Sequence, residues 1–307
     1  MSIDIVMGTY NGAAFLEEQI ESLRVQTVRD WRLIVRDDGS SDDTVDLLRQ
    51  ASRRDTRVSL VCDDLGNLGF NRNFLHLLAL SHAPYVMFCD QDDVWMPQKI
   101  ELTLKEMLSA QRQNAARPAL VHCDARVVDA NLCELRSRFI GSRGRRPGMS
   151  SVLFANCAQG AASMLNGPLR DEVLKFQPLL PYDWHCALVA QALGTRLFVD
   201  EPLLFYRQHS HNAIGTATVK KVPHDLRVSP TLQLSIDASE AVSQTVNFFS
   251  NRLSARVTRE MTDYYNVLTE KNRLKRLWIA LRRRYSFGRR RDSIDFILYV
   301  LKILKYP

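Results

Sequence analysis

The chain has 307 residues, of which 46% are hydrophobic and 24% are charged. This composition predicts a globular protein with one large core and an appendage, and it excludes a disordered tail. The first residues lack the pattern of a secretion signal and no run of 18 apolar residues occurs, so we expect a cytoplasmic protein. The six cysteines are scattered without a Cys-x-x-Cys pair, which is typical of reduced structural thiols.

Positive charge is concentrated in one segment. The formal net charge is +7, but residues 271–291 contain ten Lys or Arg and no Asp or Glu, so the remainder carries −3. An anionic partner is therefore expected for the C-terminal part of the chain.

Apolar runs and helical periodicities alternate along the first third. We expect strands at 3–7, 31–35, 58–62 and 85–89, and helices at 13–25, after residue 44 through residue 48, at 70–80 and at 98–113. This alternation predicts an α/β fold with a mostly parallel sheet covered by helices on both faces. In such sheets ligands lie beyond the carboxyl ends of the strands.

Three carboxylates, Asp90, Asp92 and Asp93, follow the strand at 85–89. Like charges at one strand end repel each other unless a cation lies between them, and oxygen ligands at this density suit Mg²⁺ or Mn²⁺ together with substrate phosphates. A solvated acidic turn is the alternative.

Polar side chains also follow two other predicted strands. They are Thr9, Tyr10 and Asn11 after the first strand, and Asp37 and Asp38 after the second. Three such clusters at one sheet edge predict a single site. Residues 40–43 also have the pattern of a helix N-cap, which would leave Asp37 without a role.

No P-loop and no Gly-x-Gly-x-x-Gly pattern follows the first strand. About the first 215 residues resemble a family 2 glycosyltransferase of the GT-A fold. The resemblance rests on four motifs: Thr9-Tyr10-Asn11, the loop from Arg36-Asp37-Asp38-Gly39 to Thr44, Asn67-Leu68-Gly69, and Asp90-Gln91-Asp92-Asp93. The last motif is followed by Trp95 and Lys99. In this pattern the chain resembles bacterial putative rhamnosyltransferases of surface-polysaccharide synthesis.

The resemblance implies a nucleotide-sugar site with Mg²⁺ or Mn²⁺ as cofactor. Its nucleotide-sugar-binding residues would be Thr9, Tyr10, Asn11, Asp37, Asp38, Asn67, Asp90 and Arg207, with Tyr10 and Asp37 or Asp38 at the base and ribose. Its metal ligands would be Asp90, Asp92 and His209. A structural role for His209 is the alternative.

The second half resembles the acceptor side of the same family. Residues 156–166 would line it, and Asp183, at the start of a helix predicted to reach residue 193, would be the general base. An acceptor hydroxyl needs a base to attack the anomeric carbon, and a single in-line displacement inverts that carbon. The alternative for Asp183 is an N-cap.

We expect a catalytic domain at 1–225, with a nucleotide-sugar and metal half at 1–124 and an acceptor half at 125–225, and a helical basic extension at 226–307. Segments 141–148 and 215–230 are predicted loops, and 232–265 is predicted to be helical. The apolar segment 294–304 is too short to span a bilayer, but beside the basic block it favours binding to an anionic membrane. Packing of this helix on the catalytic domain is the alternative.

The sequence thus predicts a metal-dependent inverting glycosyltransferase that is peripheral at the inner face of the cell membrane. Its donor would be a dTDP- or UDP-sugar, with rhamnose from dTDP-L-rhamnose favoured, and its acceptor a lipid-linked polysaccharide precursor. The alternatives are a metal-dependent nucleotidyltransferase or phosphohydrolase on a similar sheet, and a non-catalytic nucleotide- or nucleic-acid-binding protein. No nucleic acid partner is expected, since only Tyr285 and Phe287 lie among the arginines that end at Arg291.

Overall fold

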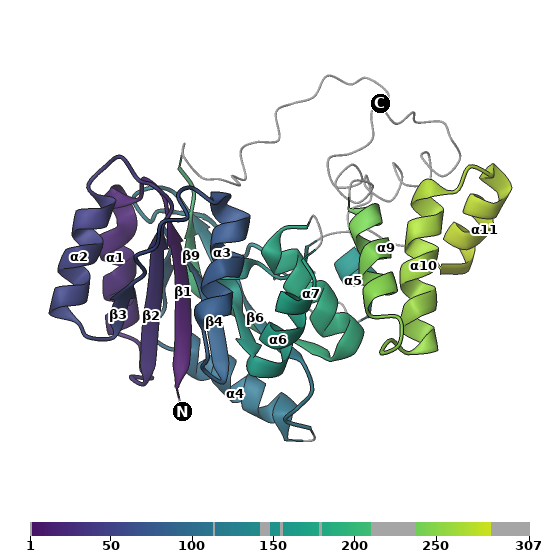
Figure 1. Ribbon diagram of the computed structural model, residues 1–307, viewed down its shortest axis with the longest axis horizontal. Coiled ribbons are helices and arrows are strands. Elements are labelled where there is room, and N and C mark those ends of the chain that lie inside the picture. Colours follow the sequence, from purple (N-terminus) through teal and green to yellow (C-terminus); the bar gives the residue numbers. More distant parts are fainter. Residues whose placement is uncertain are drawn as a thin grey trace.

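The computed structural model describes residues 2–112, 114–141, 148–153, 156–177, 180–209 and 238–283. These residues form a nine-stranded sheet with helices on both faces and a group of further helices beside it (Figure 1). The strand order is β3-β2-β1-β4-β8-β6-β9-β5, and β7 pairs with β6. The predicted α/β class is confirmed.

The first half of the sheet is parallel. Strand β1 (Ile3–Thr9) lies between β2 (Trp31–Asp37) and β4 (Tyr85–Asp90), and β3 (Val58–Leu60) pairs with the outer side of β2. Since all four strands point the same way, their carboxyl ends meet at one edge of the sheet.

The second half of the sheet is mixed. It contains β5 (Val94–Trp95), β6 (Ala119–Val128), β7 (Glu134–Arg136), β8 (Ser163–Asn166) and β9 (Thr195–Arg207). Strand β8 is antiparallel to β4 and β6, and β5 is antiparallel to β9, whereas β6 and β9 are parallel. The prediction of a mostly parallel sheet therefore holds for the first half of the sheet and not for this half. The four residues of β8 contain no local sequence signal for the direction in which the strand runs.

The helices bury the two faces of the sheet in separate apolar clusters. One face is covered by α1 (Ala13–Arg24), α2 (Thr44–Arg54) and α4 (Lys99–Gln111). The other is covered by α3 (Gly69–Leu80), α6 (Gly167–Lys175) and α7 (Tyr182–Leu193), with the short α5 (Ser150–Leu153) against α7. Successive residues of a strand serve opposite clusters, as the period of two requires: Val6 packs in the second, and Ile5 and Met7 in the first.

The predicted elements of the first third are present with shifted ends. Helix α2 continues to Arg54, beyond the expected residue 48. Helix α3 begins at Gly69, whose φ of +72° is a left-handed conformation that would strain a residue with a side chain.

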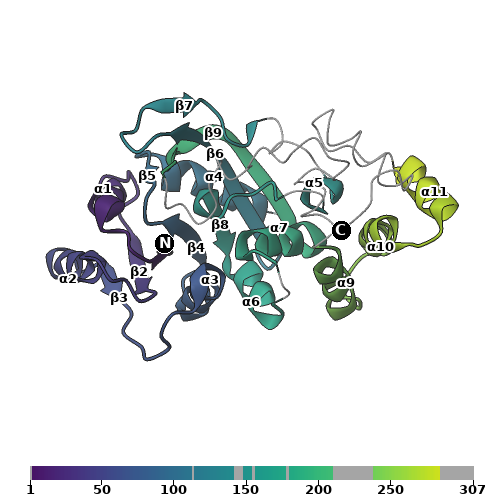
Figure 2. The same ribbon diagram turned by 90° about the horizontal axis from the view of Figure 1, so that it is seen from above.

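The C-terminal helices form a group beside the sheet (Figure 2). They are α9 (Ser239–Phe248), α10 (Ala255–Thr269) and α11 (Arg273–Arg283), and α11 lies at the outer end of the molecule. The segment predicted as one helical stretch at 232–265 is broken between α9 and α10. Ser254 causes the new start, because its side chain accepts the N–H of Val257 at 3.3 Å and caps α10.

This helical group packs on the part of the chain that contains the sheet, through α9 and the turn after it. The rings of Phe248 and Phe176 stack with their centroids 4.8 Å apart, and Arg252 pairs with Glu172 of α6. Within the described residues, no helix combines the length and apolar character that crossing a membrane requires. Residues 142–147, 210–237 and 284–307, which include the predicted loops, the boundary at 225 and the apolar segment 294–304, lie outside the described residues.

Candidate active site

The polar clusters predicted to form one site are neighbours at the carboxyl edge of the sheet. The register pairs Thr9 of β1 with Asp37 of β2, and Gly8 of β1 with Asp90 of β4. The hydroxyl of Thr9 donates a hydrogen bond to Oδ1 of Asp37 at 2.8 Å. The side chains that follow the three strands therefore open onto the same space.

The two consecutive acids after β2 have different surroundings. Asp38 is 4% exposed, and its carboxylate accepts the N–H groups of Leu68 and Gly69 at 2.7 and 2.8 Å and the guanidinium of Arg36 at 2.8 Å. Asp37 keeps partial exposure. The carboxylate of Asp37 also has partners, since it accepts hydrogen bonds from the hydroxyl of Thr9 and from the N–H and hydroxyl of Ser40. Because Asp37 is the more exposed of the two acids, we assign a contact with the nucleotide to it, as a prediction.

Arg36 organises the loop before α3 beneath the site. Its guanidinium donates to Asp63 at 2.9 Å and to the carbonyl of Gly66 at 2.7 Å, and this pairing lowers the pKa of Asp63 to about 2. The side-chain amide of Asn67 donates to the backbone carbonyl of Asp38 at 2.7 Å. Binding of a nucleotide by Asn67 stays a prediction.

Residues 40–44 cap a neighbouring helix. Oγ1 of Thr44 accepts the N–H of Gly12 at 2.8 Å, and Oδ2 of Asp42 accepts the N–H of Ala13 at 3.1 Å, so both bonds satisfy the start of α1. The N-cap residue of α2, Asp43, makes no side-chain capping bond. Oδ1 of Asp42, however, accepts the N–H of Thr44, the first residue of α2, at 3.1 Å, as the capping prediction expects. The side chains of this segment also fix the second loop against the first.

Asn11 strengthens the same connection. Its N–H donates to the hydroxyl of Ser40 at 2.8 Å, and its side-chain oxygen accepts the N–H of Ser41 at 2.8 Å. Asn11 has a φ of 48°, a left-handed conformation that Asn tolerates better than most residues. Its direct contact with the nucleotide stays a prediction.

Tyr10 is the exposed member of the first cluster, with 53% of its surface accessible. Its backbone is held by Gln91, whose amide oxygen accepts the N–H of Tyr10 at 2.9 Å and whose amide nitrogen donates to its carbonyl at 3.0 Å. The ring of Tyr10 is therefore exposed on a fixed backbone, an arrangement suited to stacking against a planar base.

The acid loop, residues Asp90 to Asp93, contains two carboxyl groups whose pKa values are raised. Burial, together with the nearby charges of Asp92 and Asp183, raises the pKa of Asp90 to about 7. Burial and the same loop's charges also raise the pKa of Asp93 well above its ordinary value. Oδ1 of Asp93 accepts the N–H of Arg207 at 3.2 Å, while Oδ2 has no hydrogen-bond partner in the described part of the chain.

These acids fit a divalent cation that prefers oxygen ligands. A carboxylate whose pKa is raised by burial and by neighbouring negative charge, as that of Asp90 is, gains from a nearby cation. Asp90 and Asp92 are the residues that would hold the ion. No group of three or more His, Cys, Asp or Glu side chains among the described residues is arranged to bind a metal by itself. The chemistry of the site therefore suits Mg²⁺ or Mn²⁺, which commonly completes its shell with water and substrate phosphates.

Arg207 and His209 lie at the end of β9 beneath the acid loop. Arg207 is 2% exposed, donates to the carbonyl of Asp92 at 2.7 Å, and pairs with Glu18 of α1. Nε2 of His209 lies 2.8 Å from Oδ2 of Asp92, and its ring packs on Phe15. Both residues support Asp92, whereas a phosphate contact of Arg207 and a metal bond of His209 stay predictions.

Asp183 stands in the first turn of α7, with Pro181 rather than Asp183 as the N-cap residue. Its carboxylate accepts the N–H of Trp184 at 2.7 Å and the N–H of Gly160 at 3.2 Å. Burial raises its pKa to about 6, although these two N–H bonds act in the opposite direction. Asp183 keeps partial exposure, as a base that meets a hydroxyl requires.

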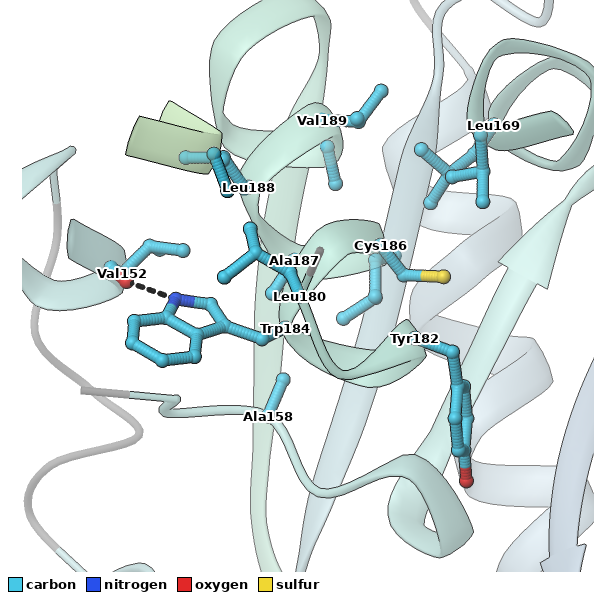
Figure 3. Packing of buried hydrophobic residues seen from close by; sticks show 14 of the residues in the cluster. Val152, Ala158, Leu169, Leu180, Tyr182, Trp184, Cys186, Ala187, Leu188 and Val189 are labelled. Atoms are coloured by element: carbon cyan, nitrogen blue, oxygen red, sulfur yellow. Dashed lines mark hydrogen bonds between the residues drawn. The ribbon is translucent and has the colours of Figure 1, made fainter. Parts of the chain in front are cut away.

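The two residues that flank Asp183 in the chain, Tyr182 and Trp184, are buried and are drawn in Figure 3. Trp184 is 1% exposed, and its indole nitrogen donates to the carbonyl of Val152 at 2.6 Å. Tyr182 points the other way and stacks on Phe74, with ring centroids 4.5 Å apart. Two buried aromatic neighbours thus fix the backbone that carries the carboxylate.

Sequence reasoning missed Arg36, Gln91 and the burial of Lys99. Arg36 and Gln91 stand inside quoted motifs, but their partners lie 27 and 81 residues away in the chain. Gly12 gave an indirect signal, since a Cβ on it would lie 2.1 Å from the amide oxygen of Gln91.

Known sequences match the first half of the chain most clearly. The family described as Glycosyl transferase family 2 matches residues 4–156. The dTDP-rhamnosyl transferase RfbG of Shigella flexneri is 24% identical over 222 residues, which are 68% of this chain and 73% of RfbG. The UDP-Glc:alpha-D-GlcNAc-diphosphoundecaprenol beta-1,3-glucosyltransferase WfgD of Escherichia coli is 31% identical over 108 residues, 34% of this chain and 41% of WfgD.

Solved structures share the fold over nearly the whole chain. S. aureus TarS 1-349 in complex with UDP-GlcNAc has a TM-score of 0.59 and 14% identity, covering 99% of this chain and 82% of that one. The mannosyltransferase PcManGT from Pyrobaculum calidifontis, in complex with GDP-Man and Mn²⁺, has a TM-score of 0.53 and 14% identity, covering 99% and 81%. The fold is that of GT-A glycosyltransferases. The chain belongs to glycosyltransferase family 2 and is a glycosyltransferase.

Proposed function

We propose that the chain transfers a sugar, rhamnose from dTDP-L-rhamnose, to a lipid-linked precursor of a surface polysaccharide. The similarity to RfbG, a dTDP-rhamnosyl transferase, supports the donor because it extends over 68% of this chain. The similarity to WfgD, whose name gives a diphosphoundecaprenol acceptor, supports a lipid-linked acceptor.

The position of Asp183 carries the proposal. Its carboxylate is partly exposed and lies close enough to Asp90 for the two charges to interact, while the N–H groups of Gly160 and Trp184 fix its direction. A carboxylate in this place takes the proton of an acceptor hydroxyl as that oxygen attacks the anomeric carbon. Attack from the face opposite the departing nucleoside diphosphate gives inversion.

The loops after β1 and β2 bind the nucleotide-sugar donor. Asp37 accepts a ribose hydroxyl and Tyr10 stacks on the base, while the loop contacts of Asn11 and Gln91 keep the two groups in place. Asp90 and Asp92 would hold Mg²⁺ or Mn²⁺, as the Mn²⁺ in the PcManGT complex suggests by analogy. The ion would supply positive charge beside the leaving pyrophosphate.

Helix α11 would bring the enzyme to its lipid-linked acceptor by contacting the membrane surface. Leu274, Trp278 and Leu281 are 78%, 57% and 67% exposed and follow one another at spacings of four and three, so they share one face of the helix. The guanidinium of Arg282 lies 4.4 Å from the Trp278 ring centroid. An exposed apolar face with cations beside it suits the interface of an anionic membrane.

The central test is Asp183→Asn. We expect transfer to fall by about 10²–10⁴-fold while nucleotide-sugar affinity stays within about threefold, because only the proton acceptor is removed. Initial rates with a panel of dTDP-, UDP- and GDP-sugars, together with calorimetry of the donor, measure both quantities. Asp64→Asn, at an exposed acid outside the site, is the matched control.

Three outcomes would contradict the proposal. If Asp183→Asn transfers the sugar at the wild-type rate, Asp183 is not the general base. If the enzyme prefers another donor, the sugar is not rhamnose. Release of pyrophosphate rather than nucleoside diphosphate would instead identify a nucleotidyltransferase.

A further inference from the structure

Lys99 is a fully buried lysine in the first turn of α4, with 0% of its surface exposed. Its ammonium nitrogen lies 3.2 Å from the centroid of the Trp95 ring and donates a hydrogen bond to the carbonyl of Ala161. Lysine is almost never fully buried unless it is paired, because burial removes the hydration of its charge. Such a position needs an explanation beyond packing.

The acid loop supplies compensating charge. The carboxylates of Asp90 and Asp93 interact electrostatically with the ammonium of Lys99, and both belong to the acid loop between β4 and β5. The Trp95 ring adds a cation–π contact on a face that water does not reach. Lys99 is thus held on the donor side of the site.

The carbonyl that Lys99 contacts belongs to the acceptor side. Ala161 is the middle residue of the 3₁₀ turn η2 (Gly160–Ala162), which leads into β8. The N–H of Gly160 in that turn donates to Oδ2 of Asp183 at 3.2 Å. A Cβ on Gly160 would lie 2.2 Å from the hydroxyl of Tyr182, so the turn packs tightly against the residue before the base.

We propose that Lys99 is a positioning residue of the transferase, whose ammonium fixes η2 and, through η2, the carboxylate of Asp183 relative to the acid loop. The inference rests on the proposed role of Asp183 as the base. One buried side chain then sets the distance between the groups that bind the donor and the group that activates the acceptor. A displacement of about 1 Å between such groups lowers a rate by roughly 10²-fold.

The test combines Lys99→Met with Asp183→Asn in a double-mutant cycle. Methionine keeps most of the volume of lysine but has neither the charge nor the N–H donor. We expect Lys99→Met to lower kcat for transfer by about 10²-fold and to leave donor affinity within about threefold, because the donor loops keep their own contacts. In the Asp183→Asn background the same substitution should cost less than about threefold, since misplacing a side chain that no longer acts as a base has no further effect.

Lys105→Met is the matched control, because Lys105 lies on the same helix and is exposed. It should leave kcat, donor affinity and melting temperature unchanged. If the losses from Lys99→Met and Asp183→Asn multiply in the double variant, Lys99 acts independently of the base and the proposal is wrong. Full activity of Asp183→Asn alone would instead refute the proposed function, so the two failures are distinguishable.

A second variant covers the case in which Lys99→Met does not fold. Lys99→Arg keeps the buried positive charge but presents a broader donor group, which displaces η2. We expect it to fold, to bind the donor normally, and to lose transfer about tenfold, again without further loss in the Asp183→Asn background. A Lys99→Arg enzyme with unchanged kcat would overturn the inference.

Discussion

The side-chain amide of Gln91 makes two hydrogen bonds to the backbone of Tyr10, one to its N–H at 2.9 Å and one from its own nitrogen to the carbonyl at 3.0 Å. Gln91 stands between the acids assigned to the metal, and Tyr10 carries the ring assigned to the base. The two loops that meet the opposite ends of a nucleotide are therefore joined directly.

Gln91→Met should weaken donor binding. The substitution removes both hydrogen bonds at similar side-chain volume, so the backbone of Tyr10 loses its support. We expect the Kd of the nucleotide-sugar to rise by about tenfold, which corresponds to roughly 1.4 kcal/mol. Calorimetry measures this, and Gln98→Met, at an exposed glutamine outside the loop, is the control. Equal affinity of the Gln91 variant and the wild type would show that the clamp does not matter for binding.

Asp92→Asn should abolish the metal dependence of donor binding. Asp92 is the acid supported by both His209 and Arg207, and the amide that replaces it cannot offer a negative charge. We expect transfer to fall by at least about 10²-fold, and donor affinity to become the same with EDTA as with Mg²⁺ or Mn²⁺. Metal-independent turnover at the full rate by the wild-type enzyme would exclude the metal site.

The rate of transfer should depend on pH through Asp183. A general base works only when deprotonated, and the pKa of Asp183 is raised to about 6 by burial. At saturating metal and donor we expect kcat to be constant above pH 7 and to fall below pH 6, approaching a tenfold loss per pH unit. The residual rate of Asp183→Asn should not show this fall of kcat in acid, which is the acidic limb of the pH–rate profile. A limb that survives in the variant belongs to another group.

Stability should decrease in mild acid because of His185. This side chain is 2% exposed, its Nε2 lies 2.7 Å from the carbonyl of Phe176, and burial lowers its pKa to about 4. The unfolded chain binds a proton near pH 6.5 and the folded chain only near pH 4, so this contribution to stability is complete above pH 6.5 and is lost progressively down to about pH 4.

We therefore expect His185→Gln to lower the free energy of unfolding by about 1 kcal/mol at pH 7, and to lose less stability than the wild type between pH 6.5 and 4. Urea unfolding at several pH values measures both effects. The exposed His82→Gln is the control, and an identical acid dependence of His185→Gln and the wild type would contradict the assignment.

Membrane association should depend on the exposed face of α11. Trp278→Gln with Leu281→Gln removes two of its three apolar side chains, and we expect binding to anionic vesicles to fall by about tenfold or more. Co-sedimentation measures the bound fraction. Leu135→Gln, a similar change at a residue of β7 that is 61% exposed, should have no effect. If the α11 variant binds as the wild type does, another segment makes the contact.

The sequence alone determined the class of fold and which polar clusters gather at the carboxyl edge of the sheet. Apolar runs such as 3–7 and 85–89 are local signals, and the polar residues that end them are adjacent in the chain, so the strand-end clusters and the acid loop were predictable. Family motifs in the right order then indicated a glycosyltransferase, which the family match confirms. The metal ligands, the base and the nucleotide contacts remain predictions.

Only the tertiary structure decided how these residues divide the work. Asp37 and Asp38 are equivalent in the sequence, but the guanidinium of Arg36 and two N–H groups from the start of α3 hold Asp38 in a buried position, whereas Asp37 keeps partial exposure. Gln91 finds its partner 81 residues away, and Lys99 finds its own 62 residues away. The direction of β8 was equally hidden. Periodicity reports which face of an element is buried, whereas these contacts depend on which elements pack together, and that is fixed only when the whole chain folds.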